Sequence, residues 1–243
     1  MTALLRIDAV SKRFGGVQAV DDCSLDVDEG AVTGLIGPNG SGKTTLFNIV
    51  TGYVRADAGA VRFAGRNVTG WDAGRLYRQG LSRTFQQARV FPQLSVLENL
   101  VVAGGYGWRQ TLGRRVSGAD QARAEELLTE FTLQPVAHLL AAELSYGQRK
   151  LLEFAAVLMS EPRLVMLDEP TAGVNPVLIR TMERHIKSRQ ERGTTFLLVE
   201  HDMAFVMRLA DPVVVLDAGR PIFQGPPERA QVDARVLDAY LGA

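Results

Sequence analysis

One short segment constrains the fold of this chain more than any other part of its sequence. The segment reads GPNGSGKT, from Gly37 to Thr44, and matches the phosphate-binding pattern G-x-x-x-x-G-K-[ST]. In that pattern a buried strand precedes the glycines and a helix follows them, so we expect a strand over 31–36 and a helix over 43–51. Glycine inside a regular element costs about 0.5–1 kcal/mol relative to alanine. Its use here indicates that the segment needs bare backbone.

A phosphate explains that need. Without Cβ atoms, backbone N–H groups can curl around phosphate oxygens, and the start of the following helix adds its positive end. We expect Lys43 to reach the β- and γ-phosphates of a nucleotide and Thr44 to ligate Mg²⁺. A glycine-rich turn that matches by chance is the alternative, and average composition predicts it in about one per cent of chains of this length. The predicted ATP-binding residues here are Gly37, Pro38, Asn39, Gly40, Ser41, Gly42, Lys43, Thr44 and Thr45.

A second apolar run, LVMLDE, ends in the two acids Asp168 and Glu169. Continuous apolar character is typical of a parallel strand that is buried on both faces. We expect Asp168 to hold Mg²⁺, directly or through its water shell, and Glu169 to be the general base for water that attacks the γ-phosphate. His201 follows a third apolar run, TTFLLVE, where it could contact the γ-phosphate, although a lone histidine at a strand end is more often structural.

The remaining pattern alternates strands with helices, which predicts an α/β fold with a parallel sheet. We interpret 1–243 as a single domain: a P-loop core (1–85 and 160–243) with an antiparallel β subdomain at the N-terminus and an inserted helical subdomain (86–159). Strands are expected over 4–10, 19–27, 60–65, 81–86, 163–170, 194–199 and 213–217, the last continuing through DAGR into a hairpin, and helices over 95–103, 118–132, 146–159, 176–192 and 202–210.

Composition limits the classes of function. The 46% of hydrophobic residues can form a sizeable core, and the formal net charge of zero argues against a general nucleic-acid binder. The single cysteine, Cys23, excludes a disulfide within the chain and fits a cytosolic location. Its place in an apolar/polar alternation predicts a buried sheet residue. No apolar run approaches the roughly 18 residues that a membrane-spanning helix requires.

The stretch LSYGQ is a second candidate anion site. Ser145 and Gln148 have the spacing of a capping box, as do Ser95 and Glu98. The simpler interpretation is a core helix with a good N-cap. However, a serine hydroxyl and the bare backbone of Gly147 at a helix start also suit a phosphate.

Taken together, these motifs resemble the ATP-binding-cassette (ABC) ATPases over nearly the whole chain. GPNGSGKTT is similar to the Walker A motif of that family, LVMLDEP to Walker B with the catalytic glutamate, LSYGQ to the signature and TAGVNP to the D-loop. His201 stands at the switch histidine, Gln86 in RTFQ at the Q-loop, and Phe14 where the family stacks an aromatic ring on adenine. Two positions depart most from the pattern: Tyr146 replaces the first signature glycine, and Asn175 stands where many members have aspartate. Phe14 stands where tyrosine is commoner, a milder change because phenylalanine also stacks.

The resemblance implies a head-to-tail dimer with a second ATPase subunit, either the same or a related chain. Each ATP would lie between the P-loop of one subunit and the signature residues of the other, which here are Leu144, Ser145, Tyr146, Gly147 and Gln148. Gln86 would sense the γ-phosphate and Mg²⁺ and connect the site to membrane permease subunits that dock near residues 86–100. The protein would act as a peripheral subunit on the cytoplasmic face of the inner membrane.

Several stretches look most like the ATPase subunits of branched-chain amino acid importers: RTFQ…LSVLEN, LSYGQRK, EPTAGVNP, VEHDM and VLDAYLGA. This resemblance implies uptake of branched-chain or other hydrophilic amino acids, with a periplasmic or extracytoplasmic solute-binding protein as a further partner. Alternatives within the family are urea or amide import and lipopolysaccharide export. Non-transport members associated with nucleic acid or ribosomes form another class, but they usually carry long coiled-coil insertions or two cassettes in one chain.

Overall fold

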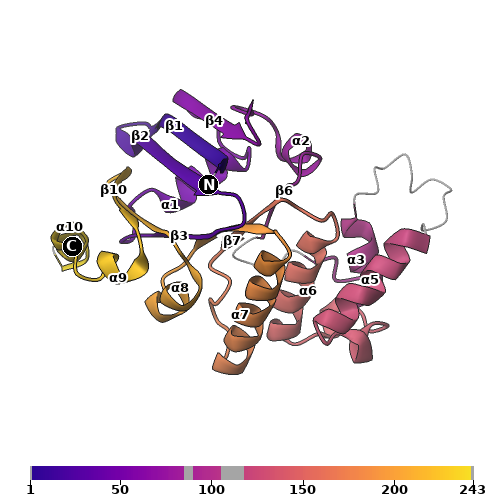
Figure 1. Ribbon diagram of the computed structural model, residues 1–243. Coiled ribbons are helices and arrows are strands. Elements are labelled where there is room, and N and C mark those ends of the chain that lie inside the picture. Colours follow the sequence, from indigo (N-terminus) through magenta and orange to yellow (C-terminus); the bar gives the residue numbers. More distant parts are fainter. Residues whose placement is uncertain (1, 85–89, 105–117, 242–243) are drawn as a thin grey trace.

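The computed structural model describes residues 2–84, 90–104 and 118–241 (Figure 1). The described elements form three layers, with an antiparallel sheet on one side, a mostly parallel sheet in the middle and most of the helices on the other side (Figure 1). The helix that follows the P-loop packs in the core between the two sheets. The predicted α/β class, the P-loop core and the antiparallel N-terminal sheet are therefore confirmed.

The antiparallel sheet is built mainly from the first two strands, which alternate buried and exposed residues and join at Gly15-Gly16. Cys23 is fully buried in it, as predicted, and burial raises the pKa of its thiol to about 12. Within the described residues, the strand order is β2-β1-β4-β5. The bounds are β1 (Ala3–Phe14), β2 (Val17–Asp28), β4 (Ala58–Phe63) and β5 (Arg66–Asn67).

The central sheet has the order β10-β9-β3-β8-β7-β6 in the described part of the chain. Its strands pair in parallel except for β10, which returns antiparallel to β9 as the predicted hairpin. Every residue of β3, β7 and β8 is buried, which explains their continuous apolar sequences. The bounds are β3 (Val32–Ile36), β6 (Leu81–Arg83), β7 (Leu164–Asp168), β8 (Thr195–Val199), β9 (Val213–Asp217) and β10 (Arg220–Gly225).

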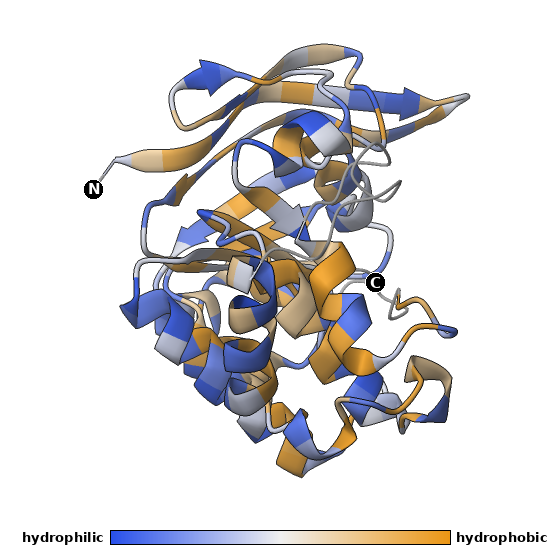
Figure 2. Ribbon diagram, turned by 90° about the vertical axis from the view of Figure 1, so that its right-hand side faces the viewer, coloured by the Kyte–Doolittle hydropathy of each residue, from blue (hydrophilic) through white to orange (hydrophobic). Residues whose placement is uncertain are grey.

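The central sheet separates two hydrophobic cores. Leu197 and Val199 of β8 pack in the core beneath the antiparallel sheet, whereas Phe196 and Leu198 belong to the core on the helical side. This alternation follows from the two-residue period of a strand. The hydropathy colouring in Figure 2 shows that the helices carry both hydrophilic and hydrophobic residues.

The helices begin and end close to the predicted positions. Both expected capping boxes are present, at Ser95 with Glu98 and at Ser145 with Gln148. The helices α3, α5 and α6 gather at one end of the molecule (Figure 1). The bounds are α1 (Lys43–Val50), α2 (Ala73–Tyr77), α3 (Val96–Ala103), α5 (Gly118–Glu130), α6 (Tyr146–Leu158), α7 (Pro176–Glu191), α8 (Met203–Leu209), α9 (Pro227–Ala230) and α10 (Ala234–Leu241), with 3-10 turns at Gln134–Val136 and Ala141–Glu143.

At the ends of two expected strands, left-handed residues account for the difference between the predicted and the observed end. The strand expected over 60–65 ends at Phe63 because Ala64 and Gly65 turn the chain with φ of 49° and 76°. The strand expected over 163–170 ends at Asp168 because Glu169 has φ of 46°. In the described part of the chain, no helix combines the length and apolar character that crossing a bilayer requires.

Candidate functional site

Three neighbouring strands bring the predicted site residues to one edge of the central sheet. The P-loop follows β3, Asp168 ends β7 with Glu169 directly after it, and His201 lies just beyond β8. Because β8 lies between β3 and β7 and all three strands are parallel, their carboxyl ends meet at the same edge. This is the place where open α/β sheets bind ligands.

The P-loop adopts a backbone that only glycine tolerates at two of its positions. A Cβ atom at Gly37 would lie 2.0 Å from the Leu216 carbonyl oxygen, and one at Gly42 would lie 2.2 Å from the Ala19 carbonyl oxygen. Both residues also have positive φ, 149° and 100°. The loop therefore packs closely between the strands β9 and β2, and its glycines are needed for close approach as well as for conformation.

The Lys43 ammonium group is held inside the P-loop. Its Nζ donates hydrogen bonds of 2.8 Å to the carbonyl oxygens of both Gly37 and Pro38. Lys43 is buried, and burial lowers its pKa, although the nearby Glu169 carboxylate acts against that shift. Thr44, next in the chain, is exposed at the start of α1, where its hydroxyl is available to a ligand.

Asp168 is buried at the end of β7, where its carboxylate forms an ion pair with Arg83, a residue that the sequence did not indicate. Burial raises the pKa of Asp168, whereas Arg83, whose Nη2 lies 3.1 Å from the Asp168 Oδ2, acts to lower it. Arg83 also donates 2.8 Å hydrogen bonds to Asn48 Oδ1 and Thr51 Oγ1 of the α1 segment. The available signal was an arginine in RTFQ, at the end of a short strand beside the expected Q-loop.

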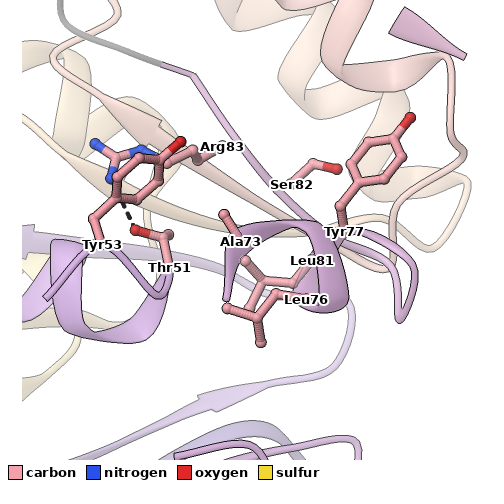
Figure 3. Close-up of a pocket in the computed structure, with 8 residues that line it drawn as sticks. All are labelled: Thr51, Tyr53, Ala73, Leu76, Tyr77, Leu81, Ser82 and Arg83. Atoms are coloured by element: carbon pink, nitrogen blue, oxygen red, sulfur yellow. Dashed lines mark hydrogen bonds between the residues drawn. The ribbon is translucent and has the colours of Figure 1, made fainter. Parts of the chain in front are cut away.

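Arg83 also forms part of the wall of a cavity of about 200 Å³. Figure 3 shows its guanidinium group beside the ring of Tyr53, with the hydrogen bond to Thr51 drawn as a dashed line. Arg83 thus connects the Asp168 carboxylate to the cavity. The lining residues are Thr51, Tyr53, Ala73, Leu76, Tyr77, Leu81, Ser82 and Arg83.

Glu169 and His201 come together as an interacting pair. The His201 Nε2 lies 2.9 Å from the Glu169 Oε1, with the histidine half exposed and the glutamate mostly buried. Glu169 is held in a left-handed conformation that costs a non-glycine residue roughly 1–3 kcal/mol, and its N–H donates to the Val199 carbonyl oxygen of β8. This strained turn directs the side chain toward His201, two residues after the end of the neighbouring strand β8.

A second residue that the sequence did not indicate, Glu200, lies directly before His201 and is 3% exposed. One of its oxygens accepts from the N–H and the hydroxyl of Thr171, and the other accepts from the N–H groups of His201 and Asp202. The only signal in the sequence was a carboxylate at the end of the apolar run TTFLLVE.

The signature residues lie at the start of α6, beside the segment that follows Glu169. Ser145 and Tyr146 are exposed, whereas Leu144 is buried in the core of its own chain. The Tyr146 hydroxyl donates a 3.0 Å hydrogen bond to the Ala172 carbonyl oxygen. The other departure, Asn175, is the N-cap of α7 and accepts from the Leu178 N–H.

Of the two remaining predicted residues, Phe14 and Gln86, only Phe14 lies within the described part of the chain. Phe14 ends β1 with 49% of its surface exposed, and the Lys12 ammonium nitrogen is 5.3 Å from the centre of its ring. An aromatic residue is thus half exposed at the hairpin that joins β1 and β2. Gln86 lies outside the described residues, so its predicted role stays a prediction.

A comparison with known protein families matches residues 20–172 to the ABC transporter family. Curated relatives match almost end to end. A protein of Pseudomonas aeruginosa described as the high-affinity branched-chain amino acid transport ATP-binding protein BraF is 38% identical, with 98% of each chain covered. The Escherichia coli K12 protein LivG, described in the same way, is 35% identical over 98% of each chain.

Solved structures agree with these matches. A nucleotide-free ATP-binding cassette from an ABC transporter is similar with a TM-score of 0.88 and 34% identity, covering 100% of both chains. Another cassette of an ABC transporter, in its ADP conformation, has a TM-score of 0.89 and 33% identity, again covering 100% of both chains.

Proposed function

Because this chain belongs to the ABC transporter family of ATP-binding proteins, we propose that it is the subunit whose ATP hydrolysis powers uptake of branched-chain or other hydrophilic amino acids. The observation that carries the proposal is the convergence of the P-loop, Asp168 and the Glu169–His201 pair on one sheet edge. The transport role and the solute class are supported by relatives that cover 98% of the chain and are named for branched-chain amino acid transport.

In this proposal the P-loop binds the phosphates of ATP, with Lys43 moving from its carbonyl partners to the β- and γ-phosphates. The backbone and side chains of 37–45 surround the phosphates, and the exposed ring of Phe14 stacks on adenine. Thr44, Asp168 and Gln86 would hold Mg²⁺, which neutralises charge on the phosphates when bound. The oxygen donors of Thr44 and Asp168 suit this hard cation.

Glu169 acts as the general base. Its carboxylate accepts a proton from water as the water oxygen attacks the γ-phosphorus, the bond from that phosphorus to the β–γ bridging oxygen breaks, and ADP leaves. His201, 2.9 Å from that carboxylate, orients the water and the phosphate. The proximity of Glu169 to Lys43 supports this role, because Lys43 marks where the terminal phosphates bind.

The site would be completed by a second ATPase subunit, with Ser145, Tyr146, Gly147 and Gln148 facing the partner's nucleotide. Ser145 and Tyr146 are exposed at the N-terminus of α6, where backbone N–H groups and the helix dipole favour an anion.

We further propose 86–159 as the helical subdomain that carries this surface. Membrane permease subunits would dock near residues 86–100, and a solute-binding protein would deliver the solute. The chain would then lie on the cytoplasmic face of the inner membrane.

Ser145→Arg tests the shared site. We expect the variant to bind ATP as a single chain but to lose the ATP-dependent dimer, because a long side chain at this helix start would occupy the phosphate position. The measurement is size-exclusion chromatography with light scattering in a Glu169→Gln background. Ser95→Arg is the matched control, since both serines cap a helix with the same box and each cap is worth about 1 kcal/mol. A normal dimer with Ser145→Arg would contradict the shared site.

The transport role is tested by the proteins that copurify with the chain. Affinity purification from detergent-solubilised membranes should recover paired hydrophobic permease subunits. Proteoliposomes reconstituted with these subunits and their solute-binding protein should take up leucine or valine only when ATP is supplied to this chain. Uptake of urea but not of leucine would select the urea alternative, and copurification with ribosomes or DNA would refute transport.

A further inference from the structure

We propose that Glu200 is a positioning residue that holds the Glu169–His201 pair in its reactive geometry. The inference rests on the proposed roles of Glu169 and His201 and adds the means by which two separate chain segments keep them together. Glu200 itself touches neither the substrate nor the reacting atoms, and acts only through the two segments that it joins.

The hydrogen bonds of Glu200 divide cleanly between those segments. The Oε1 atom accepts from the Thr171 N–H at 2.8 Å and from the Thr171 hydroxyl at 2.7 Å. The Oε2 atom accepts from the His201 N–H at 2.9 Å and the Asp202 N–H at 3.3 Å. One oxygen therefore anchors the chain that leaves β7, and the other anchors the chain that leaves β8.

These bonds close a ring of contacts around the reactive pair. Thr171 lies two residues after Glu169, within a turn closed by the Ala172 N–H and the Glu169 carbonyl oxygen at 3.1 Å. His201 reaches back to Glu169 through its Nε2 atom at 2.9 Å. The two segments are thus joined twice. The Glu169–His201 contact joins them near the solvent, and the buried side chain of Glu200 joins them beneath it.

The ring also explains how Glu169 keeps its left-handed backbone. A non-glycine residue persists in that region only where its surroundings over-determine it. At Glu169 the constraints are the hydrogen bond of its own N–H to Val199 and the anchoring of Thr171 by Glu200. Loss of the second constraint would allow the turn to relax and move the carboxylate away from His201.

Glutamine is the informative replacement because it keeps the size of Glu200 and changes the hydrogen-bonding pattern. Its single amide oxygen can serve one segment, but its NH₂ group would then face two N–H or O–H donors of the other. Buried donors left without an acceptor favour displacement of one segment. The expected consequence is misplacement of the pair, while the P-loop keeps its shape.

The test compares steady-state ATP hydrolysis of Glu200→Gln with that of Thr171→Val. Both should lower kcat by roughly 10- to 100-fold, the effect of displacing a reacting group by about 1 Å, and leave KM for ATP within about threefold. Thr171→Val removes only the hydroxyl donor at nearly constant shape, so it applies even where Glu200→Gln folds poorly. Thr171→Ser restores the donor and should recover the parent kcat.

Glu130→Gln is the matched control for the loss of a partly buried carboxylate. Glu130 pairs with Arg189 on the helical side of the chain, so its replacement should lower stability and leave kcat unchanged. In a Glu169→Gln background, Glu200→Gln should lower the residual rate by less than about threefold, because a group that acts through Glu169 has little further effect once that base is gone.

Two results overturn different claims. If Glu169→Gln lowers turnover by roughly 10²-fold or more but Glu200→Gln and Thr171→Val both keep the parent kcat, Glu200 has no positioning role and the proposed function stands. If Glu169→Gln itself hydrolyses ATP at the parent rate, the assigned base is wrong. A loss in Thr171→Val that Thr171→Ser does not recover would also contradict the inference, because the shared hydroxyl would not be the cause.

Discussion

Glu169→Gln is expected to lower the rate of ATP hydrolysis by roughly 10²- to 10⁴-fold, the range that a positioned general base contributes. The replacement has the same shape and can retain a hydrogen bond with His201, so the strained turn should survive. An amide, however, is a far weaker proton acceptor than a carboxylate at neutral pH. ATP binding should persist, and the ATP-bound dimer should accumulate because its decay requires hydrolysis.

Phosphate release at saturating ATP measures this effect, and light scattering measures the dimer. Glu161→Gln is the matched control because Glu161 also has a left-handed backbone, with φ of 49° against 46° at Glu169, but lies before β7 instead of after it. It should hydrolyse ATP at the parent rate. Parent-like turnover in Glu169→Gln would show that another group accepts the proton.

Lys43→Ala is expected to weaken ATP binding by about 100-fold, because a charge-assisted hydrogen bond to phosphate is worth roughly 1.5–3 kcal/mol and the P-loop loses its positive centre. Lys43 also donates to Gly37 and Pro38 inside the loop, so the free protein changes too. Lys43→Met removes the ammonium group but keeps most of the aliphatic stem. Comparing it with Lys43→Ala therefore separates the loss of the charge from the loss of side-chain packing.

Calorimetric titration with ATP measures the affinity of both variants. Lys187→Ala, which removes an exposed lysine of α7, should leave affinity unchanged and serves as the control. If either Lys43 variant binds ATP as tightly as the parent, the phosphate role of Lys43 has to be abandoned.

The parts of the site predicted from the sequence are those encoded within a single segment. The P-loop, the buried strand ending at Asp168 and the capping box at Ser145 each combine a local pattern with a local structure. The order of the parallel strands brings the P-loop and Asp168 to the same edge of the sheet, which is where open α/β sheets generally bind ligands.

The residues that were missed depend on partners far away in the chain. Arg83 meets Asp168 across 85 positions and Glu200 meets Thr171 across 29. Nothing in the neighbouring residues specifies such pairs, because they arise only when β6, β7 and β8 lie side by side. The helix α2 was missed for another reason: only Leu76 is buried in its five residues, which is too little for a helical period.

The two departures from the family pattern also became interpretable only in three dimensions. Asn175 caps α7 through the Leu178 N–H, a position at which asparagine and aspartate serve equally well. Asparagine at position 175 therefore preserves the local fold that aspartate gives in other members of the family. Tyr146, in contrast, adds an aromatic ring and a hydroxyl where the family usually has no side chain at all.

The hydrogen bond from the Tyr146 hydroxyl to the Ala172 carbonyl oxygen links the first turn of α6 directly to the loop that follows Glu169. Any tilt of α6 must either break this bond or carry Ala172 along with it. If α6 contacts the nucleotide of a partner subunit, as proposed, this hydrogen bond would couple nucleotide binding at that site to the loop that follows Glu169 at the chain's own site.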